Sequence, residues 1–223
     1  MRRWLAENAL SLFFFAILVT SLIGQMFAGQ RVYNEDAAAH GDPAISFGDY
    51  VLSSHFGQAM LENWQSEYLQ FSLLILATIW LIQKGSTESS EESGRESPQK
   101  QKLGGYADEG AAAWAKLPGG FRRWLFSWSL LLVMFAIWIA SWVGQSLTGW
   151  NEENNERMQH DESPIGWGDY IVSAQFWEDT LQNWQSEFLA AGSMAALSIY
   201  LRARGSAESK PVGESHQSTG VGG

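Results

Sequence analysis

Two glutamates that each introduce an apolar stretch are the first residues in this sequence that could do chemistry. Glu67 and Glu187 stand 120 positions apart, and each ends the same five-residue segment, Asn-Trp-Gln-Ser-Glu. In a helix, residues at spacings of i, i+3 and i+4 share one face. Each segment therefore predicts a polar stripe, made of Asn63, Ser66 and Glu67 in the first copy and of Asn183, Ser186 and Glu187 in the second.

A matching pair of polar residues lies near the ends of two other apolar stretches. Gln25 and Gln145 follow Gly24 and Gly144, and such small residues let two helices approach closely. If the stripes face one another, a neutral glutamate would hydrogen-bond a glutamine and join the helices, at about 0.6 kcal/mol per bond. This packing role is the leading interpretation. The alternative is a proton or cation site, because an ionisable side chain inside a bilayer is costly and marks a functional candidate.

The histidines that match between the two copies form a third candidate site. His40 and His160 each have carboxylates nearby in the sequence, namely Asp36 and Asp42, and Glu156 and Glu162. Imidazole and carboxylate groups are ligands for zinc or copper, so metal or haem binding is one hypothesis. Solvated loops also contain one histidine among loosely spaced acids, and we therefore expect no cofactor.

Composition excludes several classes of protein. The 223 residues include 14 Lys and Arg against 24 Asp and Glu, which gives a net charge of −10, and no cysteine. An acidic chain without a basic patch is not expected to bind nucleic acid. The lack of cysteine excludes disulfides, thiol catalysis and iron–sulfur clusters. No nucleophile elbow, phosphate-binding glycine loop or zinc-protease helix occurs in the sequence, so we expect a protein that is not an enzyme.

The elements that must position these residues come as an internal repeat. A shift of 120 positions aligns residues 2–89 with 122–209 without a gap; for example, Gly48-Asp49-Tyr50 recurs as Gly168-Asp169-Tyr170. The sequence predicts two membrane hairpin repeats, residues 1–84 and 121–204. A cytoplasmic linker (85–120) joins them, and a cytoplasmic tail (205–223) follows the second repeat. The linker and the tail are rich in Ser, Glu and Gly and are expected to be disordered.

Each repeat contains two apolar stretches. The first ones, about Asn8–Phe27 and Phe126–Leu147, approach the ~20 residues that span a bilayer. The second ones, Leu69–Ile82 and Leu189–Leu201, must extend back by roughly seven residues to cross a ~30 Å core. The predicted fold is an all-α membrane protein whose four transmembrane helices form two tandem-duplicated hairpins, related by a pseudo-two-fold axis along the membrane normal.

Charge predicts the orientation of these helices. Arg31 and Arg157 are the only basic residues in the loops within the hairpins, and the other 12 of the 14 lie in the N-terminus, linker and C-terminal end. By the positive-inside rule, both termini and the linker are cytoplasmic.

The first stretch also has the layout of a signal peptide, but its internal copy shares that layout, so we expect a retained helix. In the outer loops, Ile45–Ser53 and residues 165–173 predict short helices in the membrane interface.

The motifs resemble a known bacterial family of membrane proteins. The resemblance lies in the Arg-Trp start, the Gly-Gln end of the first stretch and the run Glu-Asn-Trp-Gln-Ser-Glu-Tyr at Glu62–Tyr68. That family is described only as a domain of unknown function. The resemblance covers both repeats, but not the linker or the tail. It implies a location in the bacterial cytoplasmic membrane and supplies no catalytic residue, substrate or cofactor.

Three functions are compatible with this pattern. The leading hypothesis is a non-enzymatic structural or interaction module whose partners are the lipid bilayer, further copies of the chain as a homo-oligomer, or an extracytoplasmic protein. The second hypothesis is a small proton or cation transporter or channel that uses Glu67 and Glu187. The third is an extracytoplasmic metal- or haem-binding protein that uses His40 and His160.

Overall fold

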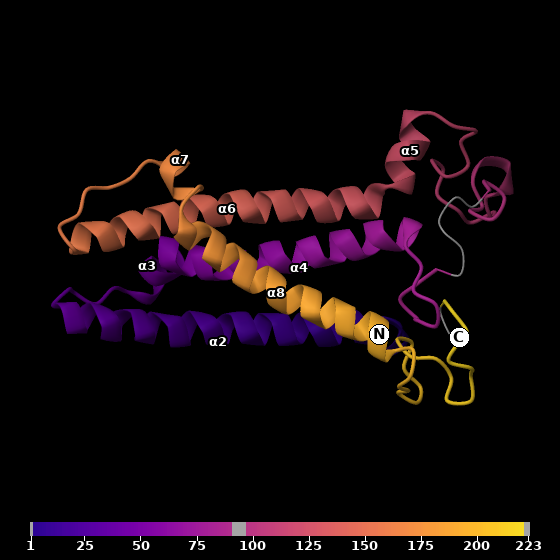
Figure 1. Ribbon diagram of the computed structural model, residues 1–223, viewed down its shortest axis with the longest axis horizontal. Coiled ribbons are helices and arrows are strands. Elements are labelled where there is room, and N and C mark those ends of the chain that lie inside the picture. The colour runs from indigo at the N-terminus through magenta and orange to yellow at the C-terminus, as the bar shows by residue number, and fades with distance from the viewer. Residues whose placement is uncertain (1, 91–96, 221–223) are drawn as a thin grey trace. The chain divides into compact units, whose positions relative to one another are not determined.

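The computed structural model describes residues 2–90 and 97–220, and within these ranges the chain is helical and has no strand. Within the described ranges nine helical elements follow one another: α1 (Arg2–Glu7), α2 (Ala9–His40), α3 (Phe47–Val51), α4 (Ser54–Trp80), the 3-10 turn η1 (Gly104–Tyr106), α5 (Phe121–Ser127), α6 (Ser129–Gln159), α7 (Trp167–Tyr170) and α8 (Ala174–Leu197). Figure 1 labels α2 to α8. The all-α class predicted from the sequence is confirmed for this part of the chain.

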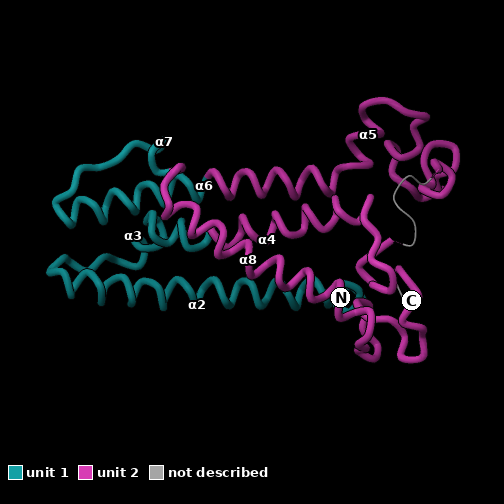
Figure 2. The backbone as a smooth tube through the Cα atoms, viewed as in Figure 1, with its two compact units in different colours: residues 1–61, 144–170 teal, residues 62–143, 171–223 magenta. Residues whose placement is uncertain are grey.

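The chain divides into two compact units (Figure 2). The first unit comprises Met1–Leu61 and Gly144–Tyr170, and the second comprises Glu62–Val143 and Ile171–Gly223. The first unit therefore holds α2, α3, α7, the first residues of α4 and the last residues of α6. The second unit holds α5, α8 and the rest of α4 and α6.

Two helices, α2 and α6, are long and apolar enough to cross a membrane by length and composition. They have 32 and 31 residues, and α2 has no buried residue: Leu10 is 72% exposed and Phe15 is 62% exposed. Charged residues begin only at Arg31 in α2 and at Glu152 in α6, so the candidate spanning segments lie before these positions.

Four spans were predicted, and only these two meet that test among the described residues. The helices α4 and α8 contain the other two apolar stretches. Those stretches are short, and the polar Asn-Trp-Gln-Ser-Glu segments directly precede them, so a window of spanning length includes polar residues. The tandem-hairpin arrangement with its pseudo-two-fold axis stays a prediction.

The helix α2 continues well beyond Phe27, where the first apolar stretch ends, because the next residues favour a helix and the first proline is Pro43. It ends at Gly41, whose φ of 84° is left-handed, and the N–H of Asp42 donates to the carbonyl of Ala37 at 2.8 Å. The helix α6 ends in the same way: Asp161 has φ 57°, and the N–H of Glu162 donates to the carbonyl of Arg157 at 2.7 Å. Both helices therefore stop at equivalent positions of the repeat.

An asparagine on each long helix fixes the loop that follows. The side chain of Asn34 donates to the carbonyl of Ile45 at 3.1 Å and accepts from the N–H of Ile45 at 2.9 Å. Asn154 makes the same two hydrogen bonds to Ile165, at 3.2 and 2.8 Å. These asparagine clamps lead into α3 and α7, the short helices predicted within residues 45–53 and 165–173. Ser46 caps α3 by accepting from the N–H of Asp49 at 3.2 Å.

A glycine on each long helix receives a buried tyrosine from the short helix. Tyr50 of α3 is 2% exposed and Tyr170 of α7 is 1% exposed. A Cβ atom on Gly29 would collide with the hydroxyl of Tyr50, and one on Gly149 would collide with the hydroxyl of Tyr170. Glycine is needed at these two positions because the phenol occupies the space of a side chain.

The predicted linker and tail contain little regular structure where they are described. Between α4 and α5 the described residues form only η1 and turns. Ser86 lies within hydrogen-bond distance of Ser198, with 3.2 Å between the hydroxyls, and Gly85 donates to the Thr219 hydroxyl at 2.9 Å. Residues 91–96 and 221–223 lie outside the described residues, and the disorder expected for 85–120 and 205–223 stays a prediction.

Candidate functional site

In the second unit, the two copies of the repeated segment contact each other across α4 and α8. The side chain of Asn183 donates to Glu62 at 2.6 Å, and the indole of Trp184 donates to Gln65 at 2.9 Å. One turn further along, Gln70 donates to the backbone carbonyl of Glu187 at 3.1 Å. We call this set the polar seam, and it consists of Glu62, Gln65, Gln70, Asn183, Trp184 and Glu187.

The buried polar residues beside the seam are not the glutamates of the motif. Gln65 and Thr180 are both 0% exposed, and the Nε2 atom of Gln65 and the hydroxyl of Thr180 have no hydrogen-bond partner. Glu67 is exposed and Glu187 is partly exposed. The two fully buried polar side chains here are therefore an amide and a hydroxyl, and the two glutamates of the motif are not among them.

The remaining predicted site residues are divided between the two units. Ser66 is buried and Ser186 is exposed, and each donates to the backbone carbonyl three residues earlier, that of Asn63 or Asn183. In the first unit, Gln25 is exposed and Gln145 is buried, and Oε1 of Gln145 has no hydrogen-bond partner. That the glutamine and glutamate stripes face one another stays a prediction.

The two matched histidines lie at the ends of the long helices, in the first unit. Nδ1 of His40 is 3.0 Å from the backbone carbonyl of Asp36 and 3.8 Å from its carboxylate. His160 is exposed just after α6. Within residues 2–90 and 97–220, no group of three or more histidine and acidic side chains is close enough to hold a metal ion.

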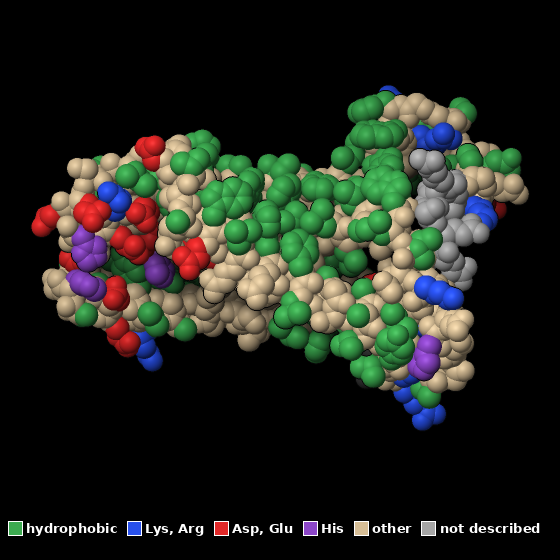
Figure 3. All heavy atoms as spheres, viewed as in Figure 1, with side chains coloured by type: hydrophobic (Ala, Val, Ile, Leu, Met, Phe, Trp, Pro, Cys, Tyr) green, Lys and Arg blue, Asp and Glu red, His purple; other side chains and the backbone are tan. Residues whose placement is uncertain are grey.

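The first unit contains a cavity of about 700 Å³ that brings these helix ends together. Its charged and titratable lining comes from α2, the loop after it, α4 and α6: Tyr33, Asp36, His40, Asp42, His55, Glu152 and Glu156. Apolar side chains complete the wall: Val32, Ala37, Pro43, Ile45 and Met158. Acidic and histidine side chains gather visibly over this end of the unit (Figure 3).

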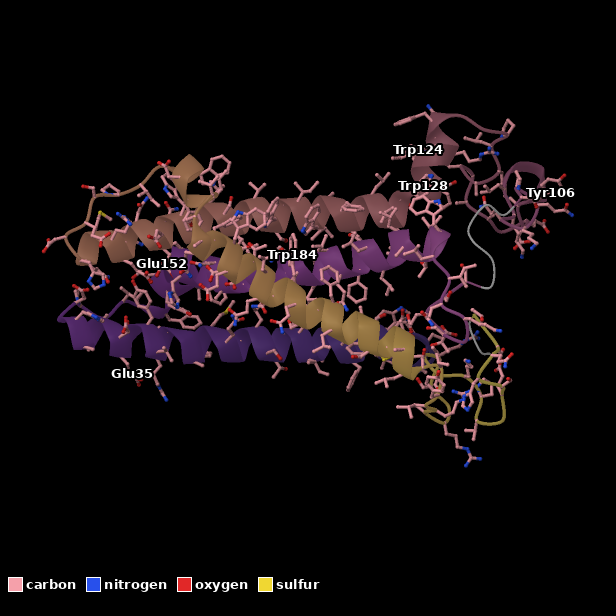
Figure 4. All side chains as sticks on the ribbon, in the orientation of Figure 1. Glu35, Tyr106, Trp124, Trp128, Glu152 and Trp184 are labelled. Carbon is pink, nitrogen blue, oxygen red and sulfur yellow. The ribbon has the colours of Figure 1, made fainter. Side chains whose placement is uncertain are left out.

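Glu152 is the centre of the polar contacts in the cavity. Its carboxylate accepts a hydrogen bond from the hydroxyl of Ser54 at 2.8 Å and lies 3.1 Å from Nδ1 of His55. These two residues begin α4, where the helix dipole also favours a negative charge. Figure 4 shows Glu152 on the inner side of α6.

The ion pair shifts both of its members toward their charged forms. The hydrogen bond that His55 donates to the carboxylate of Glu152 raises the pKa of His55 above its ordinary 6.5, although burial acts in the opposite direction. Burial opposes the ionisation of Glu152, but hydrogen bonds from His55 and Ser54 outweigh it and lower the pKa of that carboxyl below 4.5. Between these pKa values, a charged pair joins the start of α4 to α6.

Aromatic rings enclose the imidazole. The ring of Tyr33 is 5.3 Å from that of His55 and 5.9 Å from that of Tyr50. Burial, together with the carboxylates of Glu152, Asp42 and Asp36, raises the pKa of the Tyr33 phenol above 10.0. The cavity therefore has a negative potential beside an aromatic surface.

Sequence reasoning missed Tyr33, His55 and Glu152 as a site because the repeat does not preserve them. Their equivalents in the other copy are Glu153, Gln175 and Val32. The search for matched residues therefore passed over them. The signal that could have found them is the helical continuation of α2 and α6 past their apolar stretches, which brings their charged ends to the outer loops.

These features define an all-helical protein with two candidate membrane-spanning helices, an internal polar seam and an acidic cavity. The chain belongs to the family described as "Domain of unknown function (DUF6766)", which matches residues 1–221. The match includes both repeats, the linker and nearly all of the tail. No curated protein and no solved structure matches the chain.

Proposed function

We propose that this protein is a multi-pass protein of the bacterial cytoplasmic membrane, with both termini and the linker in the cytoplasm. The observation that carries the proposal is the apolar surface of α2, which has no buried residue and leaves large side chains such as Leu10 and Phe15 mostly exposed. An exposed apolar surface of this extent requires a non-aqueous environment. The helix α6 has exposed apolar residues too, among them Leu130 and Ile139, and its internal position is unlike that of a signal peptide.

We further propose four spans in two equivalent hairpins, with α4 and α8 as the returning helices. The repeated contacts support this arrangement. The asparagine clamps, the glycine–tyrosine contacts and the left-handed helix ends occur once in each copy. In the polar seam, α4 and α8 contact each other through their copies of the same repeated segment, which supports the pairing of these two helices between the hairpins.

The function that the geometry supports best is a non-enzymatic binding or interaction module held by these spans. At 1.5 Å per residue, the 13 residues of α2 after Phe27 reach about 20 Å beyond the apolar segment. They carry the charged wall of the cavity. Its partners would be a molecule or protein on the extracytoplasmic side, with homo-oligomers as a further means of covering the apolar faces.

A second candidate, proton or cation transport, has one observation in its favour. The buried amide of Gln65 and the hydroxyl of Thr180 lack partners in the interior of the second unit, where a water or hydrated ion would satisfy them. Glu67 and Glu187 lie on the same two helices. Flux through proteoliposomes that is lost in Glu67→Gln/Glu187→Gln would favour this function.

Single-cysteine labelling tests the topology directly, because the chain has no cysteine of its own. Four exposed positions are suitable: Glu35, Glu109, Ser163 and Gln217. Four spans place residues 35 and 163 outside and residues 109 and 217 inside. A membrane-impermeant maleimide should therefore label Glu35→Cys and Ser163→Cys in intact cells, and the other two variants only after permeabilisation.

The same four variants identify the competing topology. If α2 and α6 alone span the membrane, residue 109 is outside and residue 163 is inside. Labelling of Glu109→Cys but not Ser163→Cys in intact cells would contradict the four-span proposal. Membrane insertion itself would be contradicted if no variant were labelled in intact cells and all of the protein were found in the soluble fraction after lysis.

A further inference from the structure

The cavity of the first unit has the properties of a small-molecule site. Its volume of about 700 Å³ lies within the range of ligand pockets in proteins. One wall is apolar, with Val32, Ile45 and Met158, and the aromatic ring of Tyr33 adjoins it. Such a wall holds the hydrocarbon part of a ligand, and polar groups elsewhere fix its orientation.

The polar groups of the cavity have one predominant sign. Asp36 comes from α2, Asp42 from the loop after it, and Glu152 and Glu156 from α6. His55 contacts Glu152 and His40 lies 3.8 Å from the carboxylate of Asp36, so the four carboxylates of the lining outnumber its two imidazoles. The carboxylates therefore attract a cation from different walls, and the face of Tyr33 adds a cation–π contact.

The spacing of these carboxylates argues against a bare metal ion. Among the residues that the structure describes, three or more of these side chains never converge closely enough to coordinate one ion. An extended cation with charges at two ends meets separated carboxylates better, and its alkyl body contacts the apolar wall.

We propose that this cavity binds a small organic dication, an alkyl diamine in its ammonium form, with its charges on the carboxylates of α2 and α6. This inference deepens the proposed binding role and depends on it, but not on the proposed orientation in the membrane. Purified full-length protein in detergent tests it, whereas cysteine labelling tests the topology, so the two failures are distinguishable.

The experiment is calorimetric titration with 1,4-diaminobutane at about pH 8, where His55 carries less positive charge than at lower pH. The uncharged 1,4-butanediol, of equal length, is the ligand control. We expect saturable binding of the diamine and no heat from the diol. Binding should weaken toward about pH 6, because protonated His55, which faces Glu152, Glu156 and Asp36 beside Tyr33 and Tyr50, then competes for the same carboxylates.

Matched variants identify the site. Asp36→Asn removes an exposed carboxylate of the cavity and should weaken diamine binding about tenfold. Glu35→Gln removes the neighbouring charge, which lies on the opposite side of α2 in Figure 4 and does not line the cavity, and should leave binding unchanged. Glu152→Gln should weaken binding further, and the melting temperature of each variant shows whether it is folded.

A lysine side chain of a protein would offer the same ammonium chemistry with a single charge. Nα-acetyl-lysine N-methylamide is the probe for that source, and we expect it to bind more weakly than the diamine. Equal effects of Asp36→Asn and Glu35→Gln would overturn the proposal, as would binding of the diol or tighter binding of the lysine derivative. Absence of diamine binding to folded wild-type protein would overturn it as well.

Discussion

The polar seam of the second unit and the acidic cavity of the first unit differ in what their side chains contact. In the seam, amide and indole groups bond across α4 and α8, as in the contacts Asn183–Glu62 and Trp184–Gln65. In the cavity, Glu152 bonds to Ser54 and His55, while Asp36 and Asp42 contribute further carboxylates to the lining.

The polar seam and the cavity differ in how far the repeat preserves their residues, and this difference favours different roles for them. Four of the six seam residues belong to the segment that occurs twice, and residues of both copies take part in the same contacts, as a structural joint between the copies would require. The cavity depends on His55 and Glu152, whose equivalents Gln175 and Val32 have no charge. A site that only one copy can form is not needed for joining the copies, which favours a ligand-binding role for the cavity and a packing role for the seam.

The largest effect on the free energy of unfolding is expected at a glycine of the first unit that has no space for a side chain. Gly149→Ala should lower the free energy of unfolding by about 1–3 kcal/mol, because its methyl group collides with the hydroxyl of the buried Tyr170. The measurement is unfolding by SDS titration in detergent micelles. Gly24→Ala is the control, since nothing lies within 4 Å of its Cβ position and alanine favours a helix. Equal stability of the two variants would show that the tyrosine is not packed against α6.

In the seam, Gln65→Ala should cost about 1–3 kcal/mol, because it empties a fully buried position and leaves the indole N–H of the partly buried Trp184 without its acceptor. It should not change diamine affinity, whereas Asp36→Asn should change affinity and hardly affect stability. Thermal melting and calorimetry on the same preparations measure both quantities. A Gln65→Ala variant with wild-type stability and lost diamine binding would reverse the roles assigned to the two regions.

The charged pair of the cavity predicts a pH-dependent stability. The raised pKa of His55 contributes stability below about 6.5 that is lost as the pH rises through the folded-state value. The lowered pKa of Glu152 contributes stability above about 4.5 that is lost as the pH falls through its own folded-state value. Both contributions are present between these limits.

The variant His55→Gln, which introduces the residue found at the equivalent position of the other copy, removes this dependence. Wild type should exceed it by about 1 kcal/mol or less near pH 5.5, because the imidazole is 43% exposed and solvent screens the pair. The difference should shrink toward about pH 9. Melting curves across this range measure it, and a difference that grows with pH would contradict the assignment of His55 as the cation of the pair.

The seam and the cavity also differ in how much of each could be predicted from the sequence. Repeated residues predicted the helical class and the paired short helices. They also singled out the Asn-Trp-Gln-Ser-Glu segment as a candidate site. They did not predict which member of that segment is buried, because Gln65 and Glu67 differ by 200° around a helix and only packing decides which of them turns inward. They also did not predict the cavity, since Tyr33, His55 and Glu152 come from three helices and share no spacing in the sequence.

The smallest effect is expected at Glu67, the residue that the sequence singled out first. Its side chain is exposed within the second unit, while Gln65, two positions earlier, is fully buried. Glu67 is not a member of the polar seam, so its replacement by a neutral isostere, Glu67→Gln, should change the free energy of unfolding by less than about 0.5 kcal/mol. If instead the variant is destabilised as strongly as Gln65→Ala, then Glu67 must be covered in the membrane by another chain. Crosslinking of single-cysteine variants at position 67 would detect that neighbour, and the seam would then join chains as well as hairpins.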